Sequence, residues 1–155
     1  MAKYRKHLKK LLAVLLIICM FASNVLPANA TGIVEPRASD YLDSYNAYIY
    51  PASLGRIQIW FTVTGVNYMD EIGSLTILLY ESTDQTNWTW VKTYKHDTYT
   101  DMLDYNDIYH TSHVEYSGTI GRYYKAYVTI WAGKDGAGDT RYFWTQPKKA
   151  TLFAG

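Results

Sequence analysis

Cysteine is nearly absent from this sequence, which has 155 residues and a single Cys, Cys19. That residue lies in an N-terminal segment that we expect to be removed, so the processed chain would contain no disulfide and no thiol nucleophile. Its stability would come from the burial of a core, and a domain of this length buries about two thirds of its unfolded surface.

Long apolar runs are absent beyond the first thirty residues. The chain begins with a basic stretch that carries five of its Lys and Arg residues; an apolar run over residues 11–22 and the tripeptide Ala28-Asn29-Ala30 follow. A basic start, an apolar run too short to span a bilayer and an A-x-A site are typical of a signal peptide. We therefore predict that residues 1–30 are a signal peptide, that the protein is secreted, and that no membrane span remains after cleavage.

An excess of basic charge is also missing. Removal of the signal would leave 10 Lys and Arg against 14 Asp and Glu, so the net charge would change from +1 to −4. A weakly acidic protein has no positive field that would attract nucleic acid or an anionic membrane. Neither is expected as a partner.

Catalytic motifs are lacking as well. Gly133-Lys134-Asp135-Gly136 has neither the spacing nor the following helix of a phosphate loop, and no Gly-x-Ser-x-Gly motif occurs. A carboxylate pair for glycoside hydrolysis is recognised by its separation in space, and the 125 residues after residue 30 are a poor host for a large cleft. We predict that the protein is not an enzyme.

Aromatic residues are abundant, with 16 Tyr and 5 Trp, and these residue types favour strands. Two stretches, residues 56–66 and 121–132, alternate regularly between apolar and polar positions, as half-buried strands do. The positions predicted to face a core are Ile57, Ile59, Phe61 and Val63 in the first stretch and Tyr124, Ala126, Val128 and Ile130 in the second.

Shorter alternating stretches predict further strands at residues 40–50, 75–80, 88–95, 114–116 and 141–145. About seven strands without a helix of normal length favour an all-β fold, a single antiparallel β-sandwich of the immunoglobulin or fibronectin type, with a small β-barrel as the alternative. Tyr124, inward-facing at a strand start, fits a tyrosine corner, and Trp88 or Trp90 fits the core tryptophan of such a sandwich.

The remaining segments complete the predicted organisation. Residues 31–39 are expected to be a flexible lead, residues 40–147 the domain and residues 148–155 a C-terminal tail. Residues 65–73 are expected to be a connection with one helical turn at 68–71, and the Gly-rich residues 132–138 a hairpin. Residues 96–113 are polar and acidic, and so long a segment is either a functional loop or an unrecognised element.

Residues 39–150 resemble a family of small secreted proteins of unknown function from Gram-positive, often gut-dwelling, bacteria. The segments that carry the resemblance are residues 39–45 (Ser-Asp-Tyr-Leu-Asp-Ser-Tyr), 68–73 (Tyr-Met-Asp-Glu-Ile-Gly), 79–84 (Leu-Tyr-Glu-Ser-Thr-Asp), 121–127 (Gly-Arg-Tyr-Tyr-Lys-Ala-Tyr), 133–136 (Gly-Lys-Asp-Gly) and 139–143 (Asp-Thr-Arg-Tyr-Phe). The resemblance implies secretion and a one-domain, β-rich fold. It implies no activity and no functional residues.

Two sets of residues are candidate metal ligands. His110 and His113, three residues apart, would hold zinc with His96 or a nearby Asp if a helix or tight turn brought them together. Four acids would suit calcium, although their spacing differs from that of an EF-hand loop: Asp97, Asp101, Asp104 and Asp107. We expect structural histidines, a solvated acidic loop and no cofactor.

The best positive signal is an aromatic face opposite the predicted core. It consists of Trp60, Tyr123, Tyr127 and Trp131. Flat aromatic patches flanked by polar groups suit sugar rings or a protein partner. We predict a non-catalytic binding module for a glycan or a cell-surface protein; the alternatives are a structural protein that uses these rings for cross-strand packing and a metal-dependent hydrolase with His110 and His113.

Overall fold

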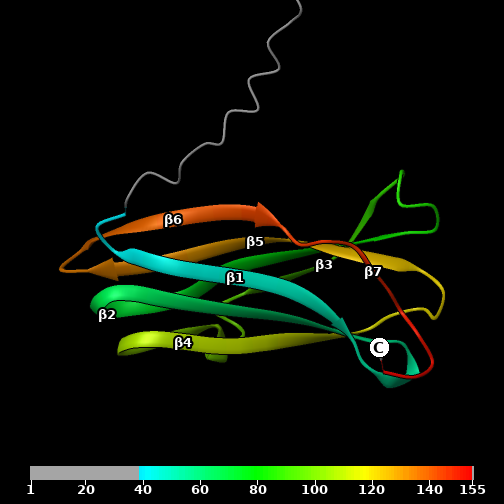
Figure 1. The fold of residues 1–155 in the computed structure, drawn as a ribbon, viewed down its shortest axis with the longest axis horizontal. Helices are drawn as coiled ribbons and strands as arrows, with labels where there is room; N and C mark the ends of the chain where they lie inside the picture. The colour runs from blue at the N-terminus through cyan, green and yellow to red at the C-terminus, as the bar shows by residue number, and fades with distance from the viewer. Residues whose placement is uncertain (1–38, 155) are drawn as a thin grey trace, which may run out of the picture. The chain divides into compact units, whose positions relative to one another are not determined.

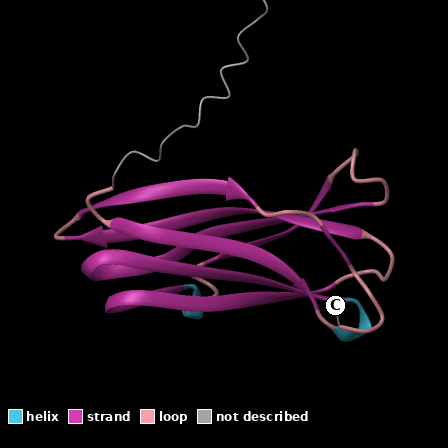
Figure 2. Ribbon diagram, in the orientation of Figure 1, coloured by secondary structure: helices cyan, strands magenta, loops and turns pink. Residues whose placement is uncertain are grey.

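A computed structural model describes residues 39–154, so the predicted signal peptide and all but the last residue of the predicted lead lie outside the described residues. The described part is almost entirely strand (Figure 2). Its strands are β1 (Leu42–Pro51), β2 (Arg56–Ser82), β3 (Thr89–Lys95), β4 (Leu103–Ser117), β5 (Tyr123–Lys134), β6 (Ala137–Trp144) and β7 (Lys148–Lys149). Two short 3-10 turns, η1 (Ser53–Gly55) and η2 (Thr100–Met102), join them, and residues 39–154 contain no helix long and apolar enough to cross a membrane.

The seven strands form one antiparallel sheet, which confirms the predicted all-β class, the antiparallel arrangement and the strand number. The first half of β2 lies between β1 and β4, and its second half pairs with β5 on one side and with β4 and then β3 on the other. Both β2 and β4 bend where residues 65–69 of β2 lie opposite residues 107–109 of β4 (Figure 1). The sheet thereby doubles over into a half-barrel.

The core lies between the two halves of the folded sheet. All eight residues that the alternation assigned to the core of the two clearest strands have no exposed surface: Ile57, Ile59, Phe61, Val63, Tyr124, Ala126, Val128 and Ile130. Period-two alternation identifies them because successive side chains of a strand point to opposite faces.

The connection predicted at residues 65–73 is wrong. β2 continues through it without a helical turn, and Met69 and Ile72 in this segment are buried in the core. The alternation is lost because the strand turns the corner here, and the bend exposes side chains such as Tyr68, which is 65% exposed. The predicted hairpin at residues 132–138 is confirmed: Asp135 and Gly136, both with positive φ, form the two-residue turn between β5 and β6.

Residues 96–113, for which the sequence indicates either a functional loop or an unrecognised element, contain most of β4. β4 begins at Leu103, eleven residues before the short strand predicted at 114–116. The sequence pattern does not reveal this strand, because most of its side chains are exposed and it carries few apolar residues.

Neither Trp88 nor Trp90 is a core residue, so that prediction is wrong. Trp90 is 56% exposed. Leu79 pairs with Lys92 but Tyr80 pairs with Trp90, so Val91 has no partner and forms a bulge. A bulge reverses the faces of the residues before it, which turns Trp90 outward although Tyr94 points inward. The buried aromatic residues are Phe61, Tyr94 and Tyr124.

The predicted C-terminal tail is part of the fold as far as Ala150. Lys148 and Lys149 pair with the start of β5, and Ala150 is buried. The Ala150 N–H donates to the Arg122 carbonyl at 2.8 Å, and the Gly121 N–H donates to the Ala150 carbonyl at 2.9 Å. The domain therefore extends past the boundary expected at residue 147.

Tyr124 forms the expected tyrosine corner. Its hydroxyl accepts the Thr119 N–H at 2.8 Å and donates to Glu81 Oε2 at 3.0 Å. Its ring is fully buried, so one side chain connects the core, the turn before β5 and the end of β2.

Replacing Tyr124 with Phe should lower the free energy of unfolding by about 1–3 kcal/mol, because the Thr119 N–H and the Glu81 carboxylate lose a shared partner at a partly buried site. Urea denaturation would measure the change. The control is Tyr142→Phe, at a ring that is 60% exposed, which should shift stability by less than about 0.5 kcal/mol. Equal effects of the two substitutions would contradict a stabilising corner.

Stability should also fall with pH above 10. Burial raises the pKa of the Tyr94 and Tyr124 phenols above their ordinary value of 10.0. Above that pH the unfolded chain releases protons that the folded chain retains, so stability is complete below pH 10 and is lost as pH rises toward the folded-state values. Tyrosinate absorbance and denaturation curves, measured at a series of pH values between about 8 and 12, would check this. That range spans the ordinary tyrosine pKa of about 10. Ionisation of every tyrosine with the fold intact would refute it.

Candidate aromatic ligand site

The outer surface of the layer formed by β3, the second half of β2, β5 and β6 carries a cluster of rings. The strand register brings them together, since Tyr127 of β5 pairs with Leu78 on one side and with Trp144 on the other. We define the aromatic face as Tyr80, Trp88, Lys125, Tyr127, Tyr142 and Trp144.

Trp144 is the hub of the aromatic face. Its ring centroid lies 5.2 Å from that of Tyr80 and 5.0 Å from that of Tyr127, with tilted planes. Tyr127 in turn is stacked on Tyr142, with an interplanar angle of 11° and a centroid separation of 6.2 Å. Trp144 is 47% exposed and Tyr142 is 60% exposed, so this cluster presents open ring surface to solvent.

Lys125 lies between two indoles. Its Nζ is 4.4 Å from the ring centroid of Trp88 and 4.4 Å from that of Trp144. Both distances are within the range of a cation–π interaction. The ammonium therefore fixes the two rings on either side of it and stays half-exposed.

A turn held by Asp84 positions Trp88. The Asp84 carboxylate accepts the N–H groups of Thr86 and Asn87 at 2.8 Å, and these donors hold the pKa of that carboxyl far below its usual range. The indole N–H of Trp88 donates to the Gln85 carbonyl at 3.0 Å. The turn thus directs the indole onto Lys125 instead of leaving it in the core.

Of the four rings predicted to bind a ligand, the structure places Tyr127 in the aromatic face. Tyr123 lies at one end of β5, with Lys149 Nζ 5.4 Å from its ring, and Trp131 lies near the other end. Trp60 lies apart from the other three, because it is on the first half of β2, which does not pair with β5. It stacks on His113 at 4.3 Å and 19°, so the four rings do not form one platform.

Most of the aromatic face was missed by sequence reasoning. The alternation in residues 141–145 is compatible with either side of the strand facing outward, because aromatic residues occupy both sides. The structure turns Tyr142 and Trp144 outward, while Phe143 packs against the core. Tyr80 belongs to a strand with apolar residues on both sides, so its sequence does not indicate which side faces outward. No pattern in the sequence signals that these rings meet, because their proximity depends on which strands are neighbours.

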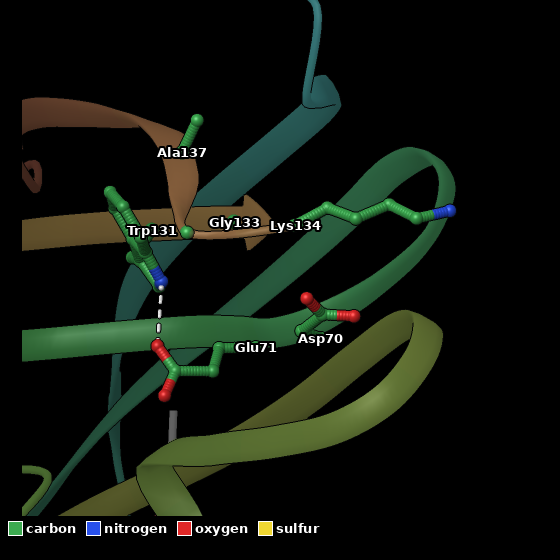
Figure 3. Close-up of a pocket in the computed structure, with 7 residues that line it drawn as sticks. Asp70, Glu71, Trp131, Gly133, Lys134 and Ala137 are labelled. Carbon is green, nitrogen blue, oxygen red and sulfur yellow. Dashed lines mark hydrogen bonds between the residues drawn. The ribbon is translucent and has the colours of Figure 1, made fainter.

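Trp131 lines a separate groove of about 320 Å³ at the end of β5 (Figure 3). Its indole N–H donates to Glu71 Oε2 at 3.2 Å, and Lys134 extends away from the ring. The ring lies over two glycines: a β-carbon would be 2.4 Å from the indole at Gly133 and 2.5 Å from it at Gly138. The two glycines leave the space that the flat ring fills.

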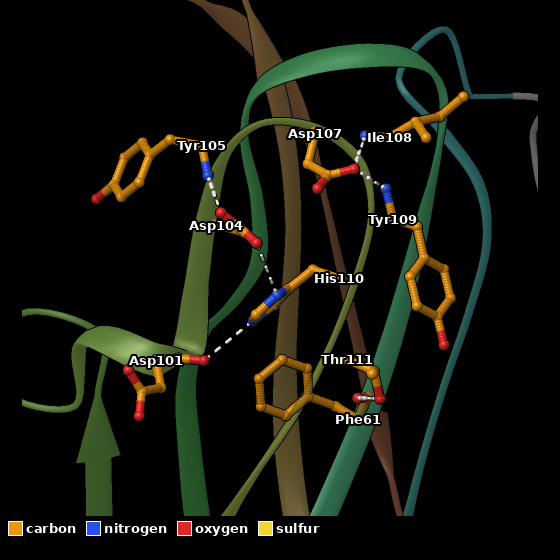
Figure 4. Close-up of polar contacts among 9 residues, drawn as sticks. All are labelled: Phe61, Asp101, Asp104, Tyr105, Asp107, Ile108, Tyr109, His110 and Thr111. Atoms are coloured by element: carbon orange, nitrogen blue, oxygen red, sulfur yellow. Dashed lines mark hydrogen bonds and ion pairs between the residues drawn. The ribbon is translucent and has the colours of Figure 1, made fainter.

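The two candidate zinc ligands, His110 and His113, do not come together. His110 and His113 lie on a strand, where a spacing of three places them on opposite faces. His110 faces inward beside Phe61, with its Nε2 3.0 Å from the Asp101 carbonyl and its Nδ1 3.6 Å from Asp104 Oδ2 (Figure 4). His113 instead stacks on Trp60.

Three of the four candidate calcium ligands accept hydrogen bonds from their own chain through their carboxylates. Asp104 accepts the Tyr105 N–H at 2.8 Å, and Asp107 accepts the Ile108 N–H at 2.6 Å and the Tyr109 N–H at 3.2 Å. Asp97 accepts the hydroxyl of Thr98 at 3.1 Å. Within residues 39–154 no three His, Cys, Asp or Glu side chains gather as a metal site would require.

No protein-family model matches the sequence, and no curated protein matches it. A crystal structure of a family 76 glycoside hydrolase from a bovine Bacteroides thetaiotaomicron strain is similar over 72% of this chain, with 14% identity and a TM-score of 0.32. The chain spans 20% of the length of that protein. A likeness this weak supports no inference about function.

Gly133→Ala should destabilise the fold by about 1–3 kcal/mol, because the added methyl group would displace the indole of Trp131 and break its bond to Glu71. The change would be measured by urea denaturation. In a Trp131→Ala background the same substitution should cost much less, since the clash is removed. Additive effects of the two substitutions would show that the glycine is not required by the ring.

Proposed function

We propose that this protein is a secreted, non-catalytic carbohydrate-binding module whose ligand stacks on the aromatic face. The observation that carries the proposal is the exposed ring surface of Tyr142 and Trp144, held in fixed positions around Tyr127 and Lys125. Secretion is supported by the basic residues, apolar run and cleavage site of residues 1–30.

A sugar suits this surface better than a protein partner. Sugar rings have faces rich in C–H groups, which stack on aromatic rings, and edges of hydroxyls, which need polar neighbours. Thr129, paired with Tyr142, and Thr93 on β3 lie on the same surface and supply such neighbours. The surface is a row of rings on strands, and preformed rings on a rigid sheet lose little conformational entropy on binding.

A second candidate, a structural protein without a dedicated ligand, is favoured by one observation. The rings predicted from the sequence are half-buried and contact partners within the chain, as Trp60 does with His113 and Trp131 with Glu71. Cross-strand packing of this kind stabilises a sheet without any ligand. The two candidates differ in whether the exposed rings bind a ligand, so a binding measurement decides between them.

Trp144→Ala should weaken glycan binding by about 10- to 100-fold, which corresponds to the loss of an aromatic contact of about 1.4–3 kcal/mol at the centre of the site. Binding would be screened on a glycan array and on isolated cell-wall polysaccharides, and affinities then measured by calorimetry.

The matched control is Trp60→Ala, which removes the same side chain from the outer surface of the other half of β2 and should leave affinity unchanged. Unfolding curves of both variants would show that the fold persists. Absence of binding to any glycan, or binding that is indifferent to Trp144, would refute the proposal and favour the structural candidate.

A further inference from the structure

The aromatic face contains a positive charge that the protein itself does not neutralise. Within residues 39–154 no carboxylate forms an ion pair with Lys125, whose Nζ contacts only the faces of two indoles. Contact with ring faces leaves N–H donors of the ammonium directed to solvent, where they can meet an acceptor on a ligand.

The arginines of the same domain, unlike Lys125, form ion pairs with carboxylates. Each described arginine lies beside a carboxylate of its own chain: Arg56 with Glu115, Arg122 with Glu81, and Arg141 with Asp139. The pair formed by Arg122 and Glu81 lies on the opposite side of the sheet from Lys125, since Glu81 pairs in the strand register with the inward-facing Tyr124. The Glu81 carboxylate accepts hydrogen bonds from Arg122 and from the Tyr124 hydroxyl, so it does not neutralise Lys125.

A second lysine, Lys149, which forms no ion pair within residues 39–154, pairs with the same end of β5. Lys149 Nζ is 5.4 Å from the centroid of Tyr123, which shares the outward side of β5 with Lys125. The acid nearest in sequence to Trp88 is Asp84, whose carboxylate is bound by N–H groups of its own turn. The aromatic face and the adjoining Tyr123 and Lys149 therefore combine ring surfaces with two ammonium groups.

The net negative charge of the processed chain does not reach this site strongly. Asp70 and Glu71 lie at the far end of the layer, where Glu71 pairs with Gly133, about 26 Å from Lys125 by the usual rise of a strand. Exposed charges are screened over a Debye length of about 8 Å at physiological salt. Asp70 and Glu71 therefore contribute little to the local field at Lys125.

We propose that the aromatic face binds acidic polysaccharides, with an anionic substituent of a stacked sugar paired to Lys125. This inference rests on the proposed function and adds the charge class of the ligand. The shared chemistry is a carboxylate or a sulfate on a sugar ring. Single-stranded nucleic acid also offers stacking surfaces and negative charge, but it is a poorer fit. Its affinity depends on several phosphate contacts, whereas the aromatic face and the adjoining Lys149 offer two ammonium groups.

The test compares polymers that differ only in charge. Affinities of the purified protein are measured for polygalacturonate against its methyl-esterified form, and for dextran sulfate against dextran. Binding to at least one charged polymer should be tenfold or more tighter than to its uncharged form, and the preference should shrink as salt is added. A preference in the polygalacturonate pair identifies a carboxylate as the substituent, and a preference in the dextran pair identifies a sulfate.

Two variants assign the preference to Lys125. Lys125→Met keeps an unbranched apolar stem between the indoles and should abolish the preference, whereas Lys125→Arg keeps the charge and the ring contacts and should retain it. The wild-type comparison needs no variant, so it decides the question even if Lys125→Met unfolds.

The outcomes separate the inference from the proposed function. Equal affinity for charged and uncharged polymers, with binding still lost in Trp144→Ala, would overturn the inference and leave carbohydrate binding intact. Binding to no polymer would overturn both. Tighter binding to a single-stranded oligonucleotide than to any polysaccharide would overturn the inference in favour of a nucleic-acid ligand.

Discussion

Strand β2 is hydrogen-bonded along nearly its whole length, and the fold depends on its passing unbroken through the corner at residues 65–69. It pairs with β1, β3, β4 and β5, so every strand except β6 and β7 is attached directly to it. The corner turns its two halves toward each other, and the side chains that one half directs inward meet those of the other. Burial of each large apolar side chain there stabilises the fold by about 1.5–3 kcal/mol, an upper estimate because the unfolded chain already buries some surface.

The same corner separates the outer surfaces of the domain. Trp60 and the rings around Trp144 are both opposite the core, yet they lie on different halves of the folded sheet. Trp60 itself is half-buried and stacks on His113, whereas Tyr142 and Trp144 are exposed. One strand thus determines both the position of the core and the gathering of the rings on one surface.

Packing and ligand binding are compatible roles for the aromatic face. Tilted and stacked ring pairs on neighbouring strands stabilise a sheet, and the same contacts hold each ring in the orientation that a ligand would need. Lys125 strengthens this arrangement through its two indole contacts. No carboxylate within residues 39–154 forms an ion pair with Lys125, so its ammonium stays available to a ligand that stacks on the rings beside it.

The sequence by itself determined the fold class and the inward side of the strands that alternate regularly. The alternate residues from Ile57 to Val63 and from Tyr124 to Ile130 could be assigned to the core, because strand geometry is local and has a period of two. The prediction failed where that period is interrupted, at the corner in β2 and at the bulge beside Trp90, and where a strand is mostly exposed, as β4 is. The composition of the candidate site was decided only by the tertiary structure. Alternation states which side of its own strand Trp60, Tyr127 or Trp144 occupies, but the pairing of distant strands decides which of these rings meet.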